Sequence, residues 1–221
     1  MPLQSGLISA VQLPITQYPK RMTAAFNFLL ELDPNFLLIW DLYGTPNIPH
    51  RPPGFETLCK IIFEQQVSLE SGKACYDKLN AMLPAFTPQN VLSSSEADFR
   101  ACGLSRQKAT YITALADAIV SRQLDLEGLE HKSPEEARHE LIKIKGIGHW
   151  TADVYLMFSL GAPDIIPLSD IGIAVTIREL WNIEDREEAK RLTHKWSPFR
   201  TAASFFLWHY YLRKRGRVIH M

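Results

Sequence analysis

Apolar residues recur at intervals of three and four along nearly the whole chain, which is the pattern of helices that bury one face. The pattern predicts helices at about 23–32, 34–42, 54–66, 69–83, 95–101, 106–122, 133–142, 148–159, 170–181, 185–195 and 199–214. Only residues 7–13 suggest a short extended segment, and a proline-rich stretch at 46–53 predicts a loop between two helical lobes. The sequence therefore predicts an all-α fold.

Two of these helices meet in a tight joint that glycine makes possible. The run Ser133–Glu136 has a capping serine, a proline at the first helical position and a glutamate at the third, so a helix begins there and continues to about Ile142. Gly146 ends it, and Gly146 and Gly148 supply the backbone freedom that a short turn needs. Ile147 between them fills the core, and a second helix starts at Gly148.

The start of the second helix is a candidate anion site. Free N–H groups at a helix N-terminus, beside glycines that let an anion approach the backbone, bind a phosphate oxygen. Lys143, Lys145 and His149 flank the turn and add a salt-dependent attraction to a nucleic-acid backbone. A Gly-x-Gly turn also occurs between helices for backbone reasons alone, so the dipeptide by itself leaves both interpretations open.

Composition agrees with a helical protein of one or two domains inside the cell. The 221 residues are 46% hydrophobic, no run is long enough to span a membrane, and residues 1–18 lack the pattern of a secretory signal. Three widely spaced cysteines argue against a disulfide framework and against a cysteine-rich metal or iron–sulfur site. Because 24 basic and 24 acidic residues cancel, any surface for nucleic acid must be local.

Asp170 is the candidate reactive carboxylate. It follows Trp150 by twenty residues, at the end of a loop with two prolines and at the start of a predicted helix. It can simply be the N-cap of that helix. The two roles are compatible, because amide donors and the positive end of a helix keep a carboxylate ionised, the form that stabilises a developing cation.

Several motifs together resemble the helix-hairpin-helix (HhH-GPD) DNA glycosylase superfamily, specifically its 3-methyladenine DNA glycosylase II type. The resemblance covers about residues 54–211. It rests on Leu-x-x-Ile-x-Gly-Ile-Gly-x-Trp-Thr-Ala at 141–152, Leu-Gly-x-Pro-Asp at 160–164, Pro-x-x-Asp at 167–170, Glu-Gln-Gln-Val-Ser at 64–68, Cys-Gly-Leu-Ser-x-x-Lys-Ala at 102–109 and Trp-x-Pro-x-Arg at 196–200.

The resemblance implies a two-lobed helical fold with the active site in the cleft between the lobes. Residues 1–53 are expected to form an N-terminal helical segment that packs with the C-terminal lobe. Residues 54–181 would form the central lobe, including the helix-hairpin-helix at 133–159, and residues 182–221 the C-terminal helices. Relatives of larger size carry an additional N-terminal sheet-containing domain, for which the region before residue 54 looks too short.

The resemblance also assigns site residues. Asp170 matches the catalytic aspartate, and Trp150 stands where strand-cutting relatives have a Schiff-base lysine, so this chain resembles the monofunctional branch. Gln66 matches the position that fills the gap left by the extruded base. The expected DNA contacts are Gly146, Gly148, Lys143, Lys145, His149, Thr151, Gln65, Gln66 and Ser68. No cofactor is required, and a monovalent cation, Na⁺ or K⁺, is expected at the hairpin carbonyls of Ile142, Ile144 and Ile147.

A flipped base needs a pocket, for which Trp150, Tyr155, Trp40 and Trp208 are the aromatic candidates; ordinary core packing is the alternative interpretation of each. The expected function is base excision repair. A monomer would bind double-stranded DNA inside the cell, release alkylated purines such as 3-methyladenine or 7-methylguanine, and leave an abasic site. Two alternatives stay open: a glycosylase for a deaminated or oxidised base, and a non-catalytic helix-hairpin-helix module that only binds DNA.

Overall fold

The computed structural model describes residues 20–49 and 51–217, and within these ranges it contains helices and no strand. The all-α prediction is confirmed; the extended segment predicted at 7–13 lies outside the described residues. The elements are α1 (Lys20–Leu32), α2 (Pro34–Tyr43), α3 (Phe55–Glu64), α4 (Leu69–Met82), α5 (Pro88–Leu92), α6 (Glu96–Ala101), α7 (Arg106–Val120), the 3₁₀ helix η1 (Glu127–His131), α8 (Pro134–Leu141), α9 (His149–Phe158), α10 (Ile171–Trp181), α11 (Arg186–His194) and α12 (Arg200–Arg213).

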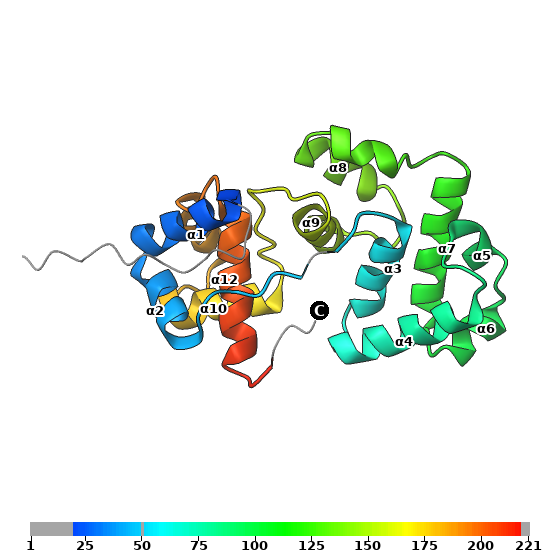
Figure 1. Ribbon diagram of the computed structural model, residues 1–221, viewed down its shortest axis with the longest axis horizontal. Coiled ribbons are helices and arrows are strands. Elements are labelled where there is room, and N and C mark those ends of the chain that lie inside the picture. Colours follow the sequence, from blue (N-terminus) through cyan, green and yellow to red (C-terminus); the bar gives the residue numbers. More distant parts are fainter. Residues whose placement is uncertain (1–19, 50, 218–221) are drawn as a thin grey trace, which may run out of the picture.

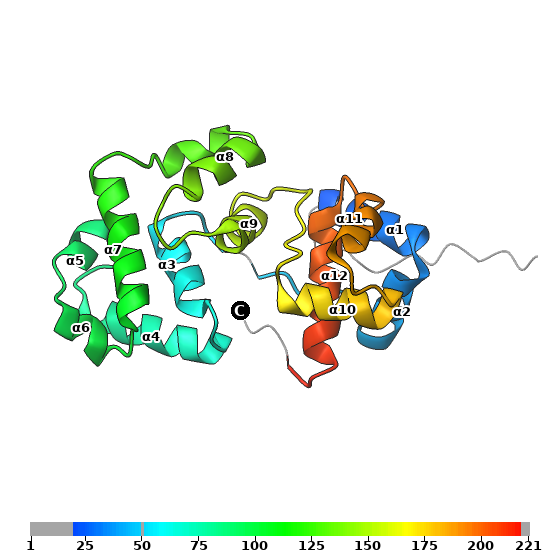
Figure 2. The same cartoon turned by 180° about the vertical axis from the view of Figure 1, so that it is seen from behind.

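The helices form two lobes, each with its own hydrophobic core (Figure 1). The central lobe contains α3 to α9 and buries residues such as Leu58, Ile112 and Tyr155. The C-terminal lobe joins α1 and α2 to α10, α11 and α12, and buries Phe36 and Phe206. Viewed from behind, α9 again lies between the two groups of helices (Figure 2). The first helices of the chain therefore pack beside the last one.

The lobe boundary differs from the predicted one at residue 181. Ile173 and Ile177 of α10 are buried in the core of the C-terminal lobe, where α10 packs against α12. The central lobe consequently ends in the loop before α10. Periodicity alone does not reveal this, because an amphipathic helix shows that one face is buried but not which neighbour covers it.

The helix ends follow their sequence signals. Ser133 and Glu136 form the expected capping box, in which the Ser133 hydroxyl accepts from the Glu136 N–H and the Glu136 carboxylate accepts from the Ser133 N–H. The C-terminal end of α3 receives a hydrogen bond from another helix. The ammonium of Lys108 on α7 donates to the carbonyl of Phe63 at 2.6 Å. The sequence analysis missed α5 and η1, whose five residues each are too short to show a helical period.

The loop that leads to α10 is tied to the start of α12. Arg200 pairs with Asp164 through two N–H···O bonds of 2.8 and 2.9 Å, and the Ser197 hydroxyl donates to the same carboxylate. The Thr201 hydroxyl donates to the carbonyl of Ala162 and accepts from the N–H of Ile165. Two motifs whose paired residues Asp164 and Arg200 are 36 positions apart in the sequence thus meet and hold the segment that carries Asp170.

The Arg200–Asp164 pair makes stability depend on pH in the acid range. Burial acts to raise the pKa of Asp164, but the hydrogen bonds from Arg200 and Ser197 outweigh it and leave the pKa below its usual value. A carboxyl group with a depressed folded-state pKa contributes stability above its unfolded pKa of about 3.9, and that stability is lost as the pH falls through the folded value.

We therefore predict that Arg200→Gln lowers the free energy of unfolding by about 1–2 kcal/mol at pH 7, between the values for an exposed ion pair and a hydrogen bond to a charged group. The difference from wild type should shrink as the pH falls below about 4 and through the lowered pKa of Asp164 in the folded wild type, because protonation of the carboxylate removes the ion pair. Urea unfolding at several pH values measures it, with exposed Arg191→Gln on α11 as the control. A deficit that stays constant down to pH 2.5 would contradict the assignment.

Candidate functional site

The carboxylate of Asp170 is the N-cap of α10 and is half-buried between the lobes. Its Oδ1 accepts hydrogen bonds from the backbone N–H groups of Gly172 at 2.8 Å and Ile173 at 3.1 Å. These are two of the N–H groups that a helix leaves unpaired at its start. The N-cap interpretation of Asp170 is therefore correct, and it fixes the carboxylate with respect to α10.

Two tryptophans from different lobes complete the surroundings of this carboxylate. The indole N–H of Trp150 on α9 donates to Oδ2 at 2.8 Å, and the indole N–H of Trp208 on α12 donates to Oδ1 at 2.9 Å. Asp170 thus accepts from four N–H groups. Three of these bonds reach Oδ1 and one reaches Oδ2, so the carboxylate is held by donors from α9, α10 and α12.

A cavity of about 260 Å³ opens in front of Asp170 and takes residues from both lobes and from the loop between α2 and α3. It contains two charged side chains besides Asp170, namely Arg51 and Glu64. Its other lining residues are mostly apolar or aromatic: Pro49, Val67, Leu69, Trp150, Val154, Phe158, Ile171, Gly172, Trp208, Tyr211 and Leu212. A mostly apolar cavity with a few fixed polar groups is the usual form of a small-ligand site.

One wall of the cavity is built from stacked rings. The rings of Phe158 and Trp208 lie 5.7 Å apart at an interplanar angle of 25°, and the guanidinium of Arg51 lies 5.5 Å from the centre of the Phe158 ring. Ile171, directly after the N-cap, is 68% exposed at the edge of the cavity. Parallel ring faces beside an exposed apolar side chain suit a flat aromatic ligand.

Two of the aromatic residues predicted for the base pocket lie elsewhere. Tyr155 has no exposed surface; it is buried in the core of the central lobe, where its hydroxyl accepts from the N–H of Gly54 at 2.9 Å. Trp40 lies on α2 and packs against the core of the C-terminal lobe. Neither lines the cavity, so for both residues core packing is the correct interpretation.

The glycines of the hairpin have different local requirements. Gly146 has φ of 95°, and a Cβ atom there would collide with the ring of Tyr111. Gly148 has φ of −89°, an ordinary value, and a Cβ atom would meet nothing within 4 Å. The fold therefore needs glycine at 146, whereas at 148 the absent side chain leaves exposed backbone free for a close approach.

The first turn of α9 presents an open helix N-terminus. No side chain caps it within the part of the chain that the structure describes. The flanking residues Lys143, Lys145 and His149 are all exposed. Exposed cations around uncapped N–H groups form a site for an anion of modest size, such as a phosphate group.

Gln65 and Thr151 hold the hairpin from the inside. The side-chain amide of Gln65, just after α3, donates to the carbonyl of Gly146 at 3.0 Å and to the hydroxyl of Thr151 at 2.9 Å. Thr151 is only 2% exposed. Both residues were predicted to contact DNA, but Thr151 is buried and the half-buried Gln65 uses its amide in these bonds, which fasten the hairpin to α3.

The segment after α3 also carries two exposed residues from the predicted DNA contacts. Gln66 has φ of 57°, a left-handed conformation that a non-glycine residue adopts at some cost, and its side chain is exposed. Ser68 is the N-cap of α4 and accepts from the N–H of Ser71. Neighbouring Val67 and Leu69 line the cavity, so this segment forms its rim in the central lobe.

Arg138 and Asp153 form a further support of the hairpin that the sequence analysis missed. Their side chains join α8 to α9 through an N–H···O bond of 2.7 Å and are only 16% and 13% exposed. Burial raises the pKa of Asp153 despite the opposing effect of Arg138. The sequence gives little indication of this pair, because the two residues lie fifteen positions apart on separate helices. A charged residue on a helix is usually exposed to solvent.

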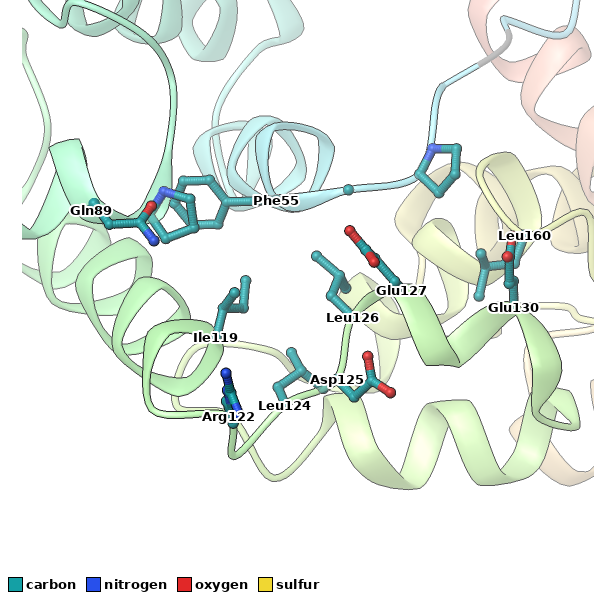
Figure 3. Close-up of a pocket in the computed structure, with 13 residues that line it drawn as sticks. Phe55, Gln89, Ile119, Arg122, Leu124, Asp125, Leu126, Glu127, Glu130 and Leu160 are labelled. Atoms are coloured by element: carbon teal, nitrogen blue, oxygen red, sulfur yellow. The ribbon is translucent and has the colours of Figure 1, made fainter.

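A larger hollow of about 880 Å³ lies at the other side of the central lobe, between α3, α5, α7 and η1 (Figure 3). Asp125, Glu127 and Glu130 stand along one of its walls, with Arg122 as the basic residue among its lining. Three carboxylates repel a phosphate backbone, and Asp170 is not part of this hollow. It is therefore not the candidate site, despite its size.

Among the described residues, no group of three or more His, Cys, Asp or Glu side chains is arranged to hold a metal ion. In the same ranges, none of the helices combines the length and the hydrophobicity that crossing a membrane requires.

The contrast between the two hairpin glycines gives a test of stability. We predict that Gly146→Ala lowers the free energy of unfolding by about 2–4 kcal/mol, because it adds both a strained φ and a clash with Tyr111. Gly148→Ala, the matched control, should change it by less than about 0.5 kcal/mol. Urea unfolding followed by circular dichroism measures both. Equal losses would show that the described hairpin conformation is wrong.

The sequence of the chain is similar to those of known proteins. The model of a family described as HhH-GPD superfamily base excision DNA repair protein matches residues 59–199. The alkylbase DNA glycosidase-like protein mag2 of Schizosaccharomyces pombe is 29% identical over 174 residues, which are 74% of this chain and 80% of that protein. The DNA-3-methyladenine glycosylase 1 of the same organism is 30% identical over 200 residues, 85% of this chain and 86% of that protein.

Solved structures show the same fold. The S. pombe 3-methyladenine DNA glycosylase Mag1, in complex with abasic DNA, has a TM-score of 0.77 and 28% identity, covering 84% of this chain and 95% of that one. A DNA-3-methyladenine glycosidase from Bacillus halodurans has a TM-score of 0.74 and 25% identity, covering 92% of this chain and 94% of the other. Nearly the whole described fold is thus shared.

Proposed function

The chain belongs to the HhH-GPD superfamily of base excision DNA repair proteins, and we propose that it is a monofunctional DNA N-glycosylase for alkylated purines. It would hydrolyse the N-glycosidic bond of a flipped methylated base, of the 3-methyladenine or 7-methylguanine kind, and leave an abasic site. One observation carries the proposal: the Asp170 carboxylate, fixed by four N–H donors, faces a cavity walled by aromatic rings.

Asp170 supports the chemistry through its charge and its fixed position. As the base departs, the sugar acquires oxocarbenium character, and a preorganised carboxylate stabilises that positive charge without reorganising. Within the described part of the chain, Oδ2 accepts only from Trp150, so its second lone pair can orient or deprotonate the attacking water. The helix N-terminus and the two indoles hold the carboxylate in place from both lobes, so its position is set before DNA binds.

The cavity supports the choice of an alkylated purine. A base inside a duplex is out of reach, so the nucleotide must be rotated out of the stack, which costs less for a damaged base. Methylation at purine nitrogens gives the base a positive charge. Such a base stacks well on electron-rich rings, here those of Trp150 and of Phe158 with Trp208. A cationic base is also a good leaving group and needs no general acid.

The absence of a suitable amine supports the monofunctional assignment. A lyase needs a nucleophilic amine, usually lysine, that forms a Schiff base with the sugar. No lysine is found among the described residues that line the cavity. Trp150 occupies the position that the resemblance assigns to that lysine, and its N–H is bonded to Asp170. The strand would therefore stay intact after base release.

The hairpin and the segment after α3 would hold the DNA on either side of the flipped nucleotide. The open start of α9, with Gly148 and the flanking Lys143, Lys145 and His149, would bind backbone phosphates without reading sequence. Exposed Gln66 would fill the gap left by the base. The protein would act on double-stranded DNA inside the cell as a monomer.

A monovalent cation, Na⁺ or K⁺, at the carbonyls of Ile142, Ile144 and Ile147 is a further part of the proposal, and no other cofactor is required. Carbonyl oxygens are hard ligands that suit such an ion. The Ile144 carbonyl already accepts from the N–H of Ile147 at 3.0 Å, and its second lone pair is available. These residues would hold the ion where its charge reinforces the attraction of the hairpin for phosphate.

The catalytic assignment is tested by base release. We predict that wild type releases methylated purines from duplex DNA treated with dimethyl sulfate, and that Asp170→Asn is slower by at least about 100-fold, the loss expected for a main electrostatic group. Asp185→Asn is the matched control: Asp185 is also a helix N-cap, on α11, but lies outside the cavity. It should keep wild-type activity.

Other results of the same assay would identify other functions. Release of deaminated or oxidised bases alone would show a glycosylase of different specificity. Full DNA binding with no release from any damaged substrate, in wild type as in Asp170→Asn, would show a non-catalytic binding module. Nicking of the strand before treatment with alkali would contradict the monofunctional assignment.

The DNA surface is tested by the dependence of binding on salt. Each phosphate contact contributes about −0.9 to the slope of log K against log salt concentration for duplex DNA. We predict that the double variant Lys143→Gln/Lys145→Gln reduces the magnitude of that slope by about 1–2. Lys190→Gln/Lys195→Gln, which removes two exposed lysines from the α11 region, should leave the slope unchanged. Equal slopes for all three proteins would exclude the hairpin lysines from the interface.

A further inference from the structure

An ion pair in the wall of the cavity has no role in the mechanism above. Glu64 is the last residue of α3, and Arg51 lies in the loop that connects α2 to α3. Their side chains are 18% and 22% exposed, and both line the cavity that contains Asp170. Charged side chains are rarely placed in a mostly apolar cavity without a partner or a ligand to bind.

The geometry of the pair is well defined. Arg51 donates from Nη1 to Oε2 at 2.9 Å and from Nη2 to Oε1 at 3.2 Å, which is the bidentate arrangement of a guanidinium with a carboxylate. The guanidinium also lies against the Phe158 ring, at 5.5 Å from its centre. Arg51 therefore holds the Glu64 carboxylate in one orientation beside the ring wall of the cavity.

The Glu64 carboxylate has capacity left for a ligand. Each of its oxygens has two acceptor positions and uses one of them for Arg51. Among residues 20–49 and 51–217, Arg51 is its hydrogen-bond partner and no other donor reaches it. Glu64 lines the cavity from α3 and Asp170 lines it from the start of α10. Figures 1 and 2 show these two helices in different lobes.

We propose that Glu64 is a specificity-determining residue whose carboxylate accepts a hydrogen bond from the exocyclic amino group of a flipped methylated adenine. The proposal rests on the proposed function and deepens it. Both purines join the sugar through the same ring nitrogen, so Asp170 at the glycosidic bond places their six-positions alike. Adenine carries an amino donor at that position and guanine a carbonyl acceptor, which an acceptor-only carboxylate disfavours.

Arg51 is then a positioning residue. Its two bonds orient the carboxylate, and its contact with Phe158 fixes the guanidinium with respect to the ring on which the base stacks. The alternative is that the pair only fastens the loop between the lobes. If so, a change at Glu64 would slow the release of all bases alike. If Glu64 instead recognises the group at position six, a variant with an amide donor there would bind methylated adenine less well and methylated guanine better.

The test measures two bases released from one substrate. Duplex DNA treated with dimethyl sulfate carries both 3-methyladenine and 7-methylguanine, and the rates of release are followed by chromatography under single-turnover conditions. Since both products come from one preparation, the ratio of their rates does not depend on the fraction of folded protein. We expect Glu64→Gln to lower the ratio of 3-methyladenine to 7-methylguanine release by about tenfold or more relative to wild type, since hydrogen bonds to charged groups are strong.

Two further variants complete the experiment. Glu56→Gln removes another ion-paired glutamate on α3 that lies outside the cavity, and it should leave the ratio unchanged. Glu64→Asp keeps a negative charge opposite Arg51 but shortens the side chain by one methylene, so it should also lower the ratio. This variant replaces Glu64→Gln in the test if Glu64→Gln does not fold.

The outcomes separate the two proposals. If wild type releases both bases and the Glu64 variants slow both equally, the specificity role is overturned and the glycosylase function stands. If wild type releases neither base, the proposed function fails. An unchanged ratio in a folded Glu64 variant likewise overturns the specificity role.

Discussion

The arrangement of this protein depends on the need to satisfy one half-buried carboxylate with hydrogen bonds. Asp170 receives two N–H groups from the start of α10, one indole N–H from α9 and one from α12. Because Trp150 belongs to the central lobe and Trp208 to the C-terminal lobe, these bonds also set how the lobes meet in front of the cavity. A shift of either lobe would leave a charged acceptor short of a partner, which is costly away from water.

Around this centre, half-buried polar contacts hold the parts that would touch DNA. Gln65 fastens the hairpin to α3, and the pair Arg138–Asp153 fastens α8 to α9. Asp164 and Arg200 hold the loop before α10. Gly148 and Gln66, which would face the DNA, can therefore be exposed. The contacts just described keep the backbone around them rigid, as a preorganised site requires.

The sequence identified the central residues of the site and misplaced some of its surroundings. Asp170 and Trp150 were assigned through the resemblance to the glycosylase superfamily, whose motifs contain both positions; spacing alone also allowed Asp170 to be only a helix N-cap. Tyr155 and Trp40 were misassigned, since an aromatic residue on an amphipathic helix looks the same whether it faces a cavity or a core. Gln65 was assigned to DNA because polarity in a sequence does not tell whether the partner is a ligand or the protein's own backbone.

By itself, the sequence determined the helices, their caps, the glycine turn and the presence of a carboxylate at the start of α10, because each depends on neighbours within a few residues. Only the tertiary structure decided that α10 belongs to the C-terminal lobe, that Trp208 joins Trp150 on one carboxylate, and that Arg51 and Glu64 enter the same cavity. These facts depend on which buried faces meet, and a one-dimensional pattern of hydrophobicity records that a face is buried without recording its partner.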